Sequence, residues 1–102
     1  MYKKEEKKPT EDLCILVAST NNDGHYYGNS HTYNVPLKEA EEATKVIEIA
    51  YEKLGNIRPV VFFGGVIQGN VGSGLTKDQL IERIAREHNY NLEEAQNKIS
   101  GK

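Results

Sequence analysis

The chain has 102 residues, of which 37% are apolar and 27% charged, with a formal net charge of -2 and a pI of about 5.9. A chain of this length has little room for a second core, so one water-soluble domain is expected. The negative net charge disfavours a dedicated DNA- or RNA-binding protein, because such proteins usually present a basic face to several phosphates.

The N-terminal segment, residues 1–10, mixes lysine and glutamate before Pro9 and contains no apolar stretch. This composition predicts a disordered tail and no secretory signal, and it leaves residues 11–102 as a single α+β domain. The apolar runs are far shorter than the ~20 residues of a membrane-spanning helix. The one cysteine, Cys14, cannot form an internal disulfide. We therefore expect a cytoplasmic protein with no membrane partner.

The first half of the chain predicts two strands and a helix. Leu13–Ala18 is a short continuous apolar run, which indicates a buried strand. After a turn at residues 20–24, Tyr26–Val35 alternates and predicts the returning strand of a hairpin, ended by Pro36. Apolar residues at helical spacing then predict one long helix over Leu37–Leu54, with Gly55 as its C-terminal cap.

Val60–Phe63 predicts a third strand, and the Gly64-Gly65 pair after it has two interpretations. The glycines can form a hairpin turn into a short strand, Val66–Gln68, or a bulge within one longer strand. The hairpin is favoured. The predicted order is then β-β-α-β-β-α-α, a small antiparallel sheet covered by one long helix and followed by a C-terminal helical hairpin.

Two capping patterns predict the C-terminal helices. Thr76 with Gln79 forms one capping box, and Asn91 with Glu94 opens a second helix. This region is similar to the opening helical hairpin of the bacterial histone-like HU family, which matches at Thr76, Lys77, Leu80, Ile81, Ile84, Ala85, Asn91, Ala95 and Ile99. The resemblance implies a helical hairpin that packs against a partner subunit. DNA binding is not implied, because the family's DNA-gripping strands have no counterpart here.

The stretch from Gly64 to Thr76 contains five of the nine glycines and links a predicted strand to a predicted helix. Within it, the glycine segment, residues 69–76, reads G-N-V-G-S-G-L-T and resembles the phosphate-binding P-loop. Leu75 stands where that family has its catalytic lysine, so no P-loop hydrolase is expected. Free amides ahead of a helix N-terminus can still hold an anion. Alternatively, the glycines only permit tight turns.

The candidate ligand-binding residues follow from this interpretation. The segment itself would contribute Gly69, Asn70, Gly72, Ser73, Gly74 and Thr76. Lys77 or Arg58 would be the charge partner, and the rings of Tyr27 and His31 would stack on a base. The three histidines are too widely spaced to predict a metal site, and no catalytic group or cofactor is indicated.

The leading hypothesis is a non-enzymatic binding module, expected to form a homo-oligomer, for a nucleotide-like or other anionic small molecule. A second hypothesis is a protein-interaction or inhibitor module that acts through the Tyr26–Tyr33 strand or the Leu80–Ile99 hairpin. A third is an accessory nucleic-acid binder that uses Lys77, Arg83 and Arg86.

Overall fold

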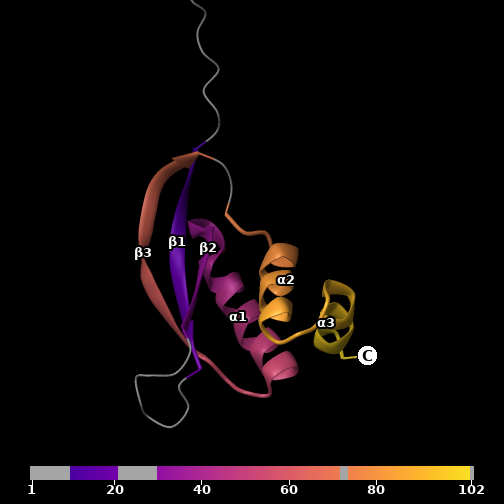
Figure 1. The fold of residues 1–102 in the computed structure, drawn as a ribbon. Coiled ribbons are helices and arrows are strands. Elements are labelled where there is room, and N and C mark those ends of the chain that lie inside the picture. Colours follow the sequence, from indigo (N-terminus) through magenta and orange to yellow (C-terminus); the bar gives the residue numbers. More distant parts are fainter. Residues whose placement is uncertain (1–9, 21–29, 72–73, 102) are drawn as a thin grey trace, which may run out of the picture.

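A computed structural model describes residues 10–20, 30–71 and 74–101. It contains a three-stranded antiparallel sheet in the order β2-β1-β3, with helices packed on one side of the sheet (Figure 1). The element order is β-β-α-β-α-α. The α+β class is therefore confirmed. The predicted disordered tail lies outside the described residues, except for Thr10, which begins β1.

The first two strands form the antiparallel pair that the sequence predicts. β1 spans Thr10–Ser19 and β2 spans Ser30–Pro36, with Cys14 opposite Val35 and Leu16 opposite Tyr33. The alternating side chains of β2 place Tyr33 and Val35 in the core. The turn and the first part of the predicted returning strand lie outside the described residues.

The prediction of a hairpin at Gly64-Gly65 is wrong, because β3 is one continuous strand, Val60–Val71. Its 12 residues pair with the ten residues of β1, and two register shifts accommodate the difference. One bulge lies beside Gly65, at φ 140°, and the other contains Gly69, at φ 61°, backbone angles that favour glycine. The segment that resembles a turn is thus a bulged edge strand.

The long predicted helix forms as one run of three pieces. A 3₁₀ turn, η1 (Leu37–Glu39), leads into α1 (Ala40–Ala50), which continues as a π turn, η2 (Tyr51–Gly55). The prediction that Gly55 caps this helix is wrong, because the left-handed residue at its end is Asn56, at φ 57°. Asparagine tolerates this conformation better than other non-glycine residues.

Both C-terminal capping boxes are confirmed. α2 spans Lys77–Glu87 and α3 spans Leu92–Ile99, and the side chains of Thr76 and Asn91 accept backbone hydrogen bonds from the third residue of each helix. α2 ends before Asn89, which adopts the left-handed conformation.

These caps give a first testable prediction. Thr76→Ala removes the acceptor for the Gln79 amide, at 3.1 Å, and should lower the free energy of unfolding by about 1 kcal/mol. Asn91→Ala removes the equivalent acceptor for Glu94 and should cost a similar amount. Urea unfolding measures both losses of free energy. Unchanged stability in both variants would contradict the stabilising role of the two caps.

The core lies between the helix-facing side of the sheet and the helices. β1 and β2 contribute Cys14, Leu16, Ala18, Tyr33 and Val35; the helices contribute Ala43, Ile47, Ala50, Tyr51, Leu54, Leu80, Ile81, Ile84, Ala85 and Ala95. Burial of this apolar surface is the main term that holds the layers together. No helix in the described part of the chain is both long and apolar enough to cross a bilayer.

Candidate functional site: the groove between β2 and α2

The glycine segment divides between strand and connection. Gly69 and Asn70 belong to β3, Gly74 and Thr76 lie in the connection to α2, and Lys77 is the first residue of α2. Gly72 and Ser73 lie outside the described residues. The segment is therefore not a single loop, because Asn70 and Val71 continue the ladder with β1 and Gly69 lies in a bulge of the same strand.

Three amides that could have faced an anion have partners within the protein. The Gly69 amide donates to Asp12 Oδ1 at 2.9 Å, the Leu75 amide to the Asn34 carbonyl at 2.9 Å, and the Thr76 amide to Gln79 Oε1 at 3.0 Å. The Asp12 carboxylate would also repel an anion beside Gly69. These amides are consequently not available to a phosphate.

Gly74 has a packing role. A Cβ at this position would lie 2.9 Å from Cδ and N of Pro36 and from the carbonyl carbon of Val35. Only a residue without a side chain allows the connection to pass this close to the end of β2. Close packing against the end of β2 therefore explains why residue 74 is a glycine.

The predicted charge and stacking partners lie away from the glycine segment. Arg58 precedes the start of β3, and Gly69 lies nine residues beyond Val60, which is about 30 Å along a strand. His31 pairs with Ala18, six residues along β1 from Asp12, or about 20 Å. Tyr27 lies outside the described residues. The structure therefore does not bring His31 or Arg58 together with the glycines.

A different set of polar groups meets beside Gly74, in a groove between β2 and α2. Its volume is about 450 Å³, and its described lining is Leu13, Thr32, Asn34, Gly74, Leu75, Gln79 and Arg83. We call it the β2–α2 groove. Thr32 and Asn34 alternate with the buried Tyr33 and Val35 along β2, whereas Gln79 and Arg83 lie one turn apart on α2.

The polar groups of this groove can bind an anion. Arg83 forms no ion pair or hydrogen bond with any other described residue, and the same holds for the side chains of Thr32 and Asn34. None of the described lining residues is acidic. The groove thus combines an exposed guanidinium with hydroxyl and amide donors, a set that suits a carboxylate or phosphate.

Two further hollows of the described surface have the opposite charge balance. One, of about 270 Å³, places Lys77 near Glu39 and Glu42, and the other, of about 440 Å³, places Lys38 near Glu11 and Asp12. Two carboxylates beside one lysine disfavour an anion. The predicted charge partner Lys77 therefore lies in an unsuitable hollow, and Arg83 is the better candidate.

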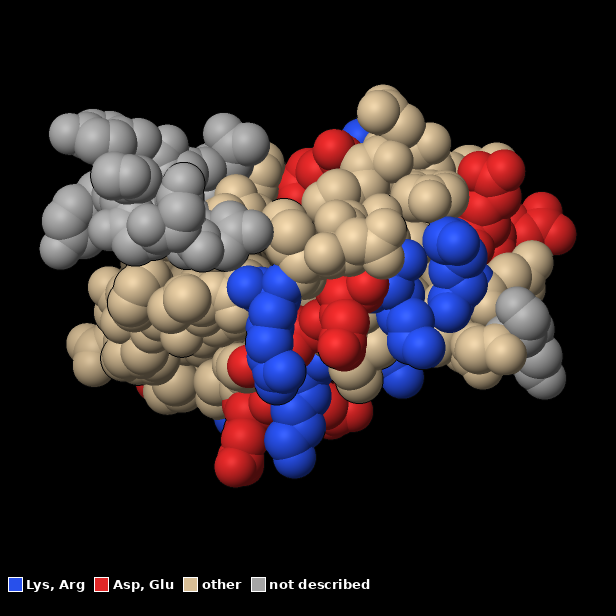
Figure 2. All heavy atoms as spheres, turned by 90° about the horizontal axis from the view of Figure 1, so that it is seen from below, with Lys and Arg blue, Asp and Glu red and all other residues tan. Residues whose placement is uncertain are grey.

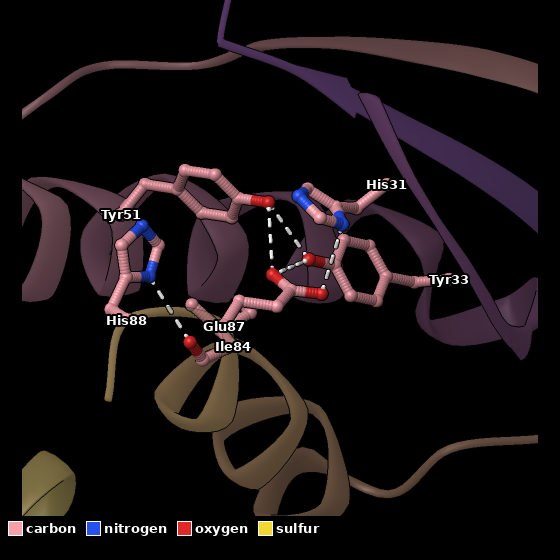
Figure 3. A network of polar contacts seen from close by, with 6 residues as sticks. All are labelled: His31, Tyr33, Tyr51, Ile84, Glu87 and His88. Atoms are coloured by element: carbon pink, nitrogen blue, oxygen red, sulfur yellow. Dashed lines mark hydrogen bonds and ion pairs between the residues drawn. The ribbon is translucent and has the colours of Figure 1, made fainter. Parts of the chain in front are cut away.

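A buried polar network lies near this groove, on the core side of β2 (Figure 3). Tyr33 donates to Glu87 Oε1 at 2.7 Å, and its hydroxyl lies 2.8 Å from that of Tyr51. Tyr51 also reaches Glu87 Oε1, at 3.3 Å, and His31 Nδ1 lies 3.2 Å from Glu87 Oε2. We call these four residues the tyrosine–Glu87 network. The network ties β2, η2 and the end of α2 to one carboxylate.

The network also governs the acidity of the two phenols. Burial raises the pKa of Tyr33 above its usual 10, and the hydrogen bonds to Tyr51 and Glu87 raise it further. Burial likewise raises the pKa of Tyr51, with the charge of Glu87 acting in the same direction and the hydrogen bond to Tyr33 opposing it. Both phenols therefore remain protonated donors at neutral pH, which fits a structural role for the network.

The predicted protein-interaction surfaces are largely part of the core. Tyr33 is fully buried, so the face of β2 that carries it is not an exposed stacking surface. Leu80, Ile81, Ile84 and Ala85 form the apolar stripe of α2 and are buried against the sheet and α1. The rest of the predicted tyrosine strand lies outside the described residues.

The cations of the predicted nucleic-acid surface are mixed with carboxylates. Arg86 pairs with Glu82 at 3.3 Å, and Lys77 shares its hollow with two glutamates. Figure 2 shows this mixture of positive and negative side chains on the face seen from below. In the described part of the chain, no group of three or more His, Cys, Asp and Glu side chains is arranged to hold a metal ion.

Sequence reasoning missed the role of Glu87 and the position of Arg83. Tyr51 falls on the apolar stripe of the predicted helix, and a buried tyrosine hydroxyl usually needs a partner, which was the available signal. Comparison of the chain with protein-family models, with curated proteins and with solved structures gives no match.

Proposed function

We propose that this protein is a non-enzymatic binding module for a nucleotide-like or other anionic small molecule, and that the β2–α2 groove is its site. The observation that supports this most strongly is the guanidinium of Arg83, which has no ion pair or hydrogen bond with any other described residue and lies among neutral donors. An arginine of this kind can bind a carboxylate or phosphate through two parallel hydrogen bonds. The anion would lie between Arg83 and the side chains of Thr32 and Asn34.

The dimensions and the remaining lining support a ligand with a flat or apolar part. A volume of about 450 Å³ falls within the ~300–1,000 Å³ typical of small-molecule sites. Leu13 and Leu75 provide apolar contact beside the polar groups. A phosphate or carboxylate attached to a ring would use both kinds of surface, which is why the proposed ligand class includes nucleotides.

The proposal treats binding as the whole activity. Arginine does not exchange its proton near neutral pH, and the amides of Asn34 and Gln79 are not acids or bases. The described lining therefore offers recognition groups but no general acid or base for a reaction.

The proposal also includes a homo-oligomer in a reducing compartment such as the cytoplasm. The buried, unpaired Cys14, whose pKa is raised by burial, suits that setting.

Arg83→Gln tests this function against a matched control. Isothermal titration of the wild-type protein with nucleoside mono- and diphosphates, the parent nucleosides and inorganic phosphate identifies the preferred class. Arg83→Gln should weaken that binding about 10- to 100-fold, because it removes charge-assisted hydrogen bonds. Arg86→Gln, the same change three residues away and outside the groove, should leave it unchanged.

The control also defines the results that contradict the proposal. If no phosphate-bearing compound binds the wild type, the groove is not an anion site of this class. Equal losses in Arg83→Gln and Arg86→Gln would indicate a diffuse charge effect, and a nucleoside that binds as tightly as its phosphate would remove Arg83 from recognition.

A further inference from the structure

The outer edge of β3 has no strand beside it in the described part of the chain. The sheet order β2-β1-β3 places β3 at one edge, where it pairs with β1 alone. Figure 1 shows that β3 lies on the side of the sheet farthest from the three helices. An unpaired edge presents a row of N–H and C=O groups that another strand can extend.

The same strand carries most of the exposed apolar surface. Among the large hydrophobic residues described, six are exposed, and four of these belong to β3: Val60, Phe62, Phe63 and Val66. Phe62 and Phe63 are the only phenylalanines of the chain, and they are 53% and 60% exposed. Large apolar side chains exposed close together on one strand can mark an interaction site.

The two phenylalanines project to opposite faces of the sheet. Phe63 lies opposite Leu16, on the face that packs against the helices, and Phe62 lies opposite Val17 on the other face. Phe63 nevertheless remains exposed, whereas its neighbour Leu16 is buried. The helices therefore cover β1 and reach Val61 of β3, but they leave Phe63 uncovered.

β3 also lacks the charges that usually protect an edge strand. All 12 residues from Val60 to Val71 are uncharged. Natural edge strands commonly carry lysine, proline or an inward charge that prevents pairing with another sheet. Here the first four residues, Val60–Phe63, are regular and end at the bulge beside Gly65. These four residues can accept a further strand without any such obstacle.

We infer that two copies of the chain associate through the Val60–Phe63 part of β3, antiparallel and about a two-fold axis. The result is a continuous sheet in the order β2-β1-β3-β3-β1-β2, with the helices of both copies on one face. This inference rests on the homo-oligomer included in the proposed function, and it names the surface that forms it. It does not depend on the β2–α2 groove, since β2 is the opposite edge of the sheet.

A second copy fits this edge better than a charged peptide does. Two-fold pairing sets one uncharged strand against an identical one, so no like charges face each other across the new ladder. Outside the residues drawn in grey, the view in Figure 2 shows charged side chains over the helices and mostly uncharged atoms on the sheet side. An acidic or basic partner strand would find no opposite charge on β3 itself.

The apolar area exposed on β3 determines the expected affinity of the dimer. A phenylalanine buries roughly 200 Å², so half-exposed Phe62 and Phe63 offer about 100 Å² each, or about 400 Å² from two copies. Val60, Val66 and the backbone edges add to this area. The total is at the small end of stable interfaces, so we expect a reversible dimer with a dissociation constant on the order of micromolar.

Sedimentation velocity of the full chain tests the inference. We expect the wild type to shift from monomer to dimer between about 1 and 200 µM. Phe63→Lys should remain monomeric, because pairing would then bury an uncompensated charge at the apolar edge in each copy. Ile49→Lys, the same type of change at a 43% exposed position on α1, should dimerise like the wild type.

Each other outcome overturns the inference. A wild type that stays monomeric at every concentration excludes a second copy as the occupant of the edge. A Phe63→Lys variant that dimerises as well as the wild type places the interface elsewhere. Circular dichroism confirms that both variants are folded. Arg83→Gln should dimerise normally, so loss of dimerisation and loss of ligand binding can be told apart.

Discussion

Glu87→Ala should lower the free energy of unfolding by about 2–4 kcal/mol. The change removes the acceptor of two buried hydroxyls, those of Tyr33 and Tyr51, and the partner of His31. A buried hydroxyl left without an acceptor costs about 1–3 kcal/mol. Because the two phenols can still bond to each other at 2.8 Å, one such hydroxyl is left, and loss of the ion pair with His31 supplies the rest of the expected effect. Since a domain of this size is stable by about 5–15 kcal/mol, the effect should be prominent in urea unfolding.

Glu82→Ala is the matched control, because it removes the same side chain from the same helix. Glu82 contacts only the exposed Arg86 among the residues described, at 3.3 Å, and exposed ion pairs of this kind contribute about 0–1 kcal/mol. If the two variants lose equal stability, the tyrosine–Glu87 network does not hold β2, η2 and α2 together as described.

Alkaline pH should destabilise the protein steeply once it passes the ordinary phenol pKa of 10. The folded state raises the pKa of Tyr33 and Tyr51, so it keeps both protons at a pH where the unfolded chain releases them. The unfolded state then binds fewer protons, and the free energy of unfolding falls as pH rises. The contribution is fully present below pH 10 and is lost above it, at about 1.4 kcal/mol per pH unit for each phenol.

Ultraviolet absorbance of tyrosinate, recorded with circular dichroism during the titration, measures this linkage. At least two of the six tyrosines should ionise only as the protein unfolds. In the double variant Tyr33→Phe/Tyr51→Phe, the stability should depend less on pH above 10. Complete ionisation of all tyrosines while the fold remains intact would contradict the buried network.

Local patterns in the sequence predict the elements whose partners are near in the chain. The capping boxes at Thr76 and Asn91 and the apolar stripe of α1 depend on residues three or four positions apart, and the structure contains all three. Local patterns do not distinguish the bulge beside Gly65 from the alternative hairpin. A hairpin and a bulge use the same glycine pair, and the choice depends on β1, whose ten residues offer a ladder for one long strand.

The candidate site depends on contacts between distant residues. Thr32 and Arg83 line one groove because α2 packs beside β2. The spacing of residues along the sequence does not indicate this packing. Glu87 meets Tyr33 across 54 positions for the same reason. The glycine segment suggested a phosphate loop, yet Gly69 serves a bulge and Gly74 a close approach to Pro36. Glycine supplies conformational freedom in either use, so composition alone does not distinguish them.

Amide chemical shifts recorded by NMR during a ligand titration test the central claim most directly. The titrant is the nucleoside phosphate that binds best by calorimetry, with inorganic phosphate as the reference. We predict saturable shift changes that cluster at Thr32, Asn34, Gln79 and Arg83 and disappear in Arg83→Gln. Changes confined to the amides of residues 69–73, or no saturable change at all, would contradict an anion site in the groove between β2 and α2.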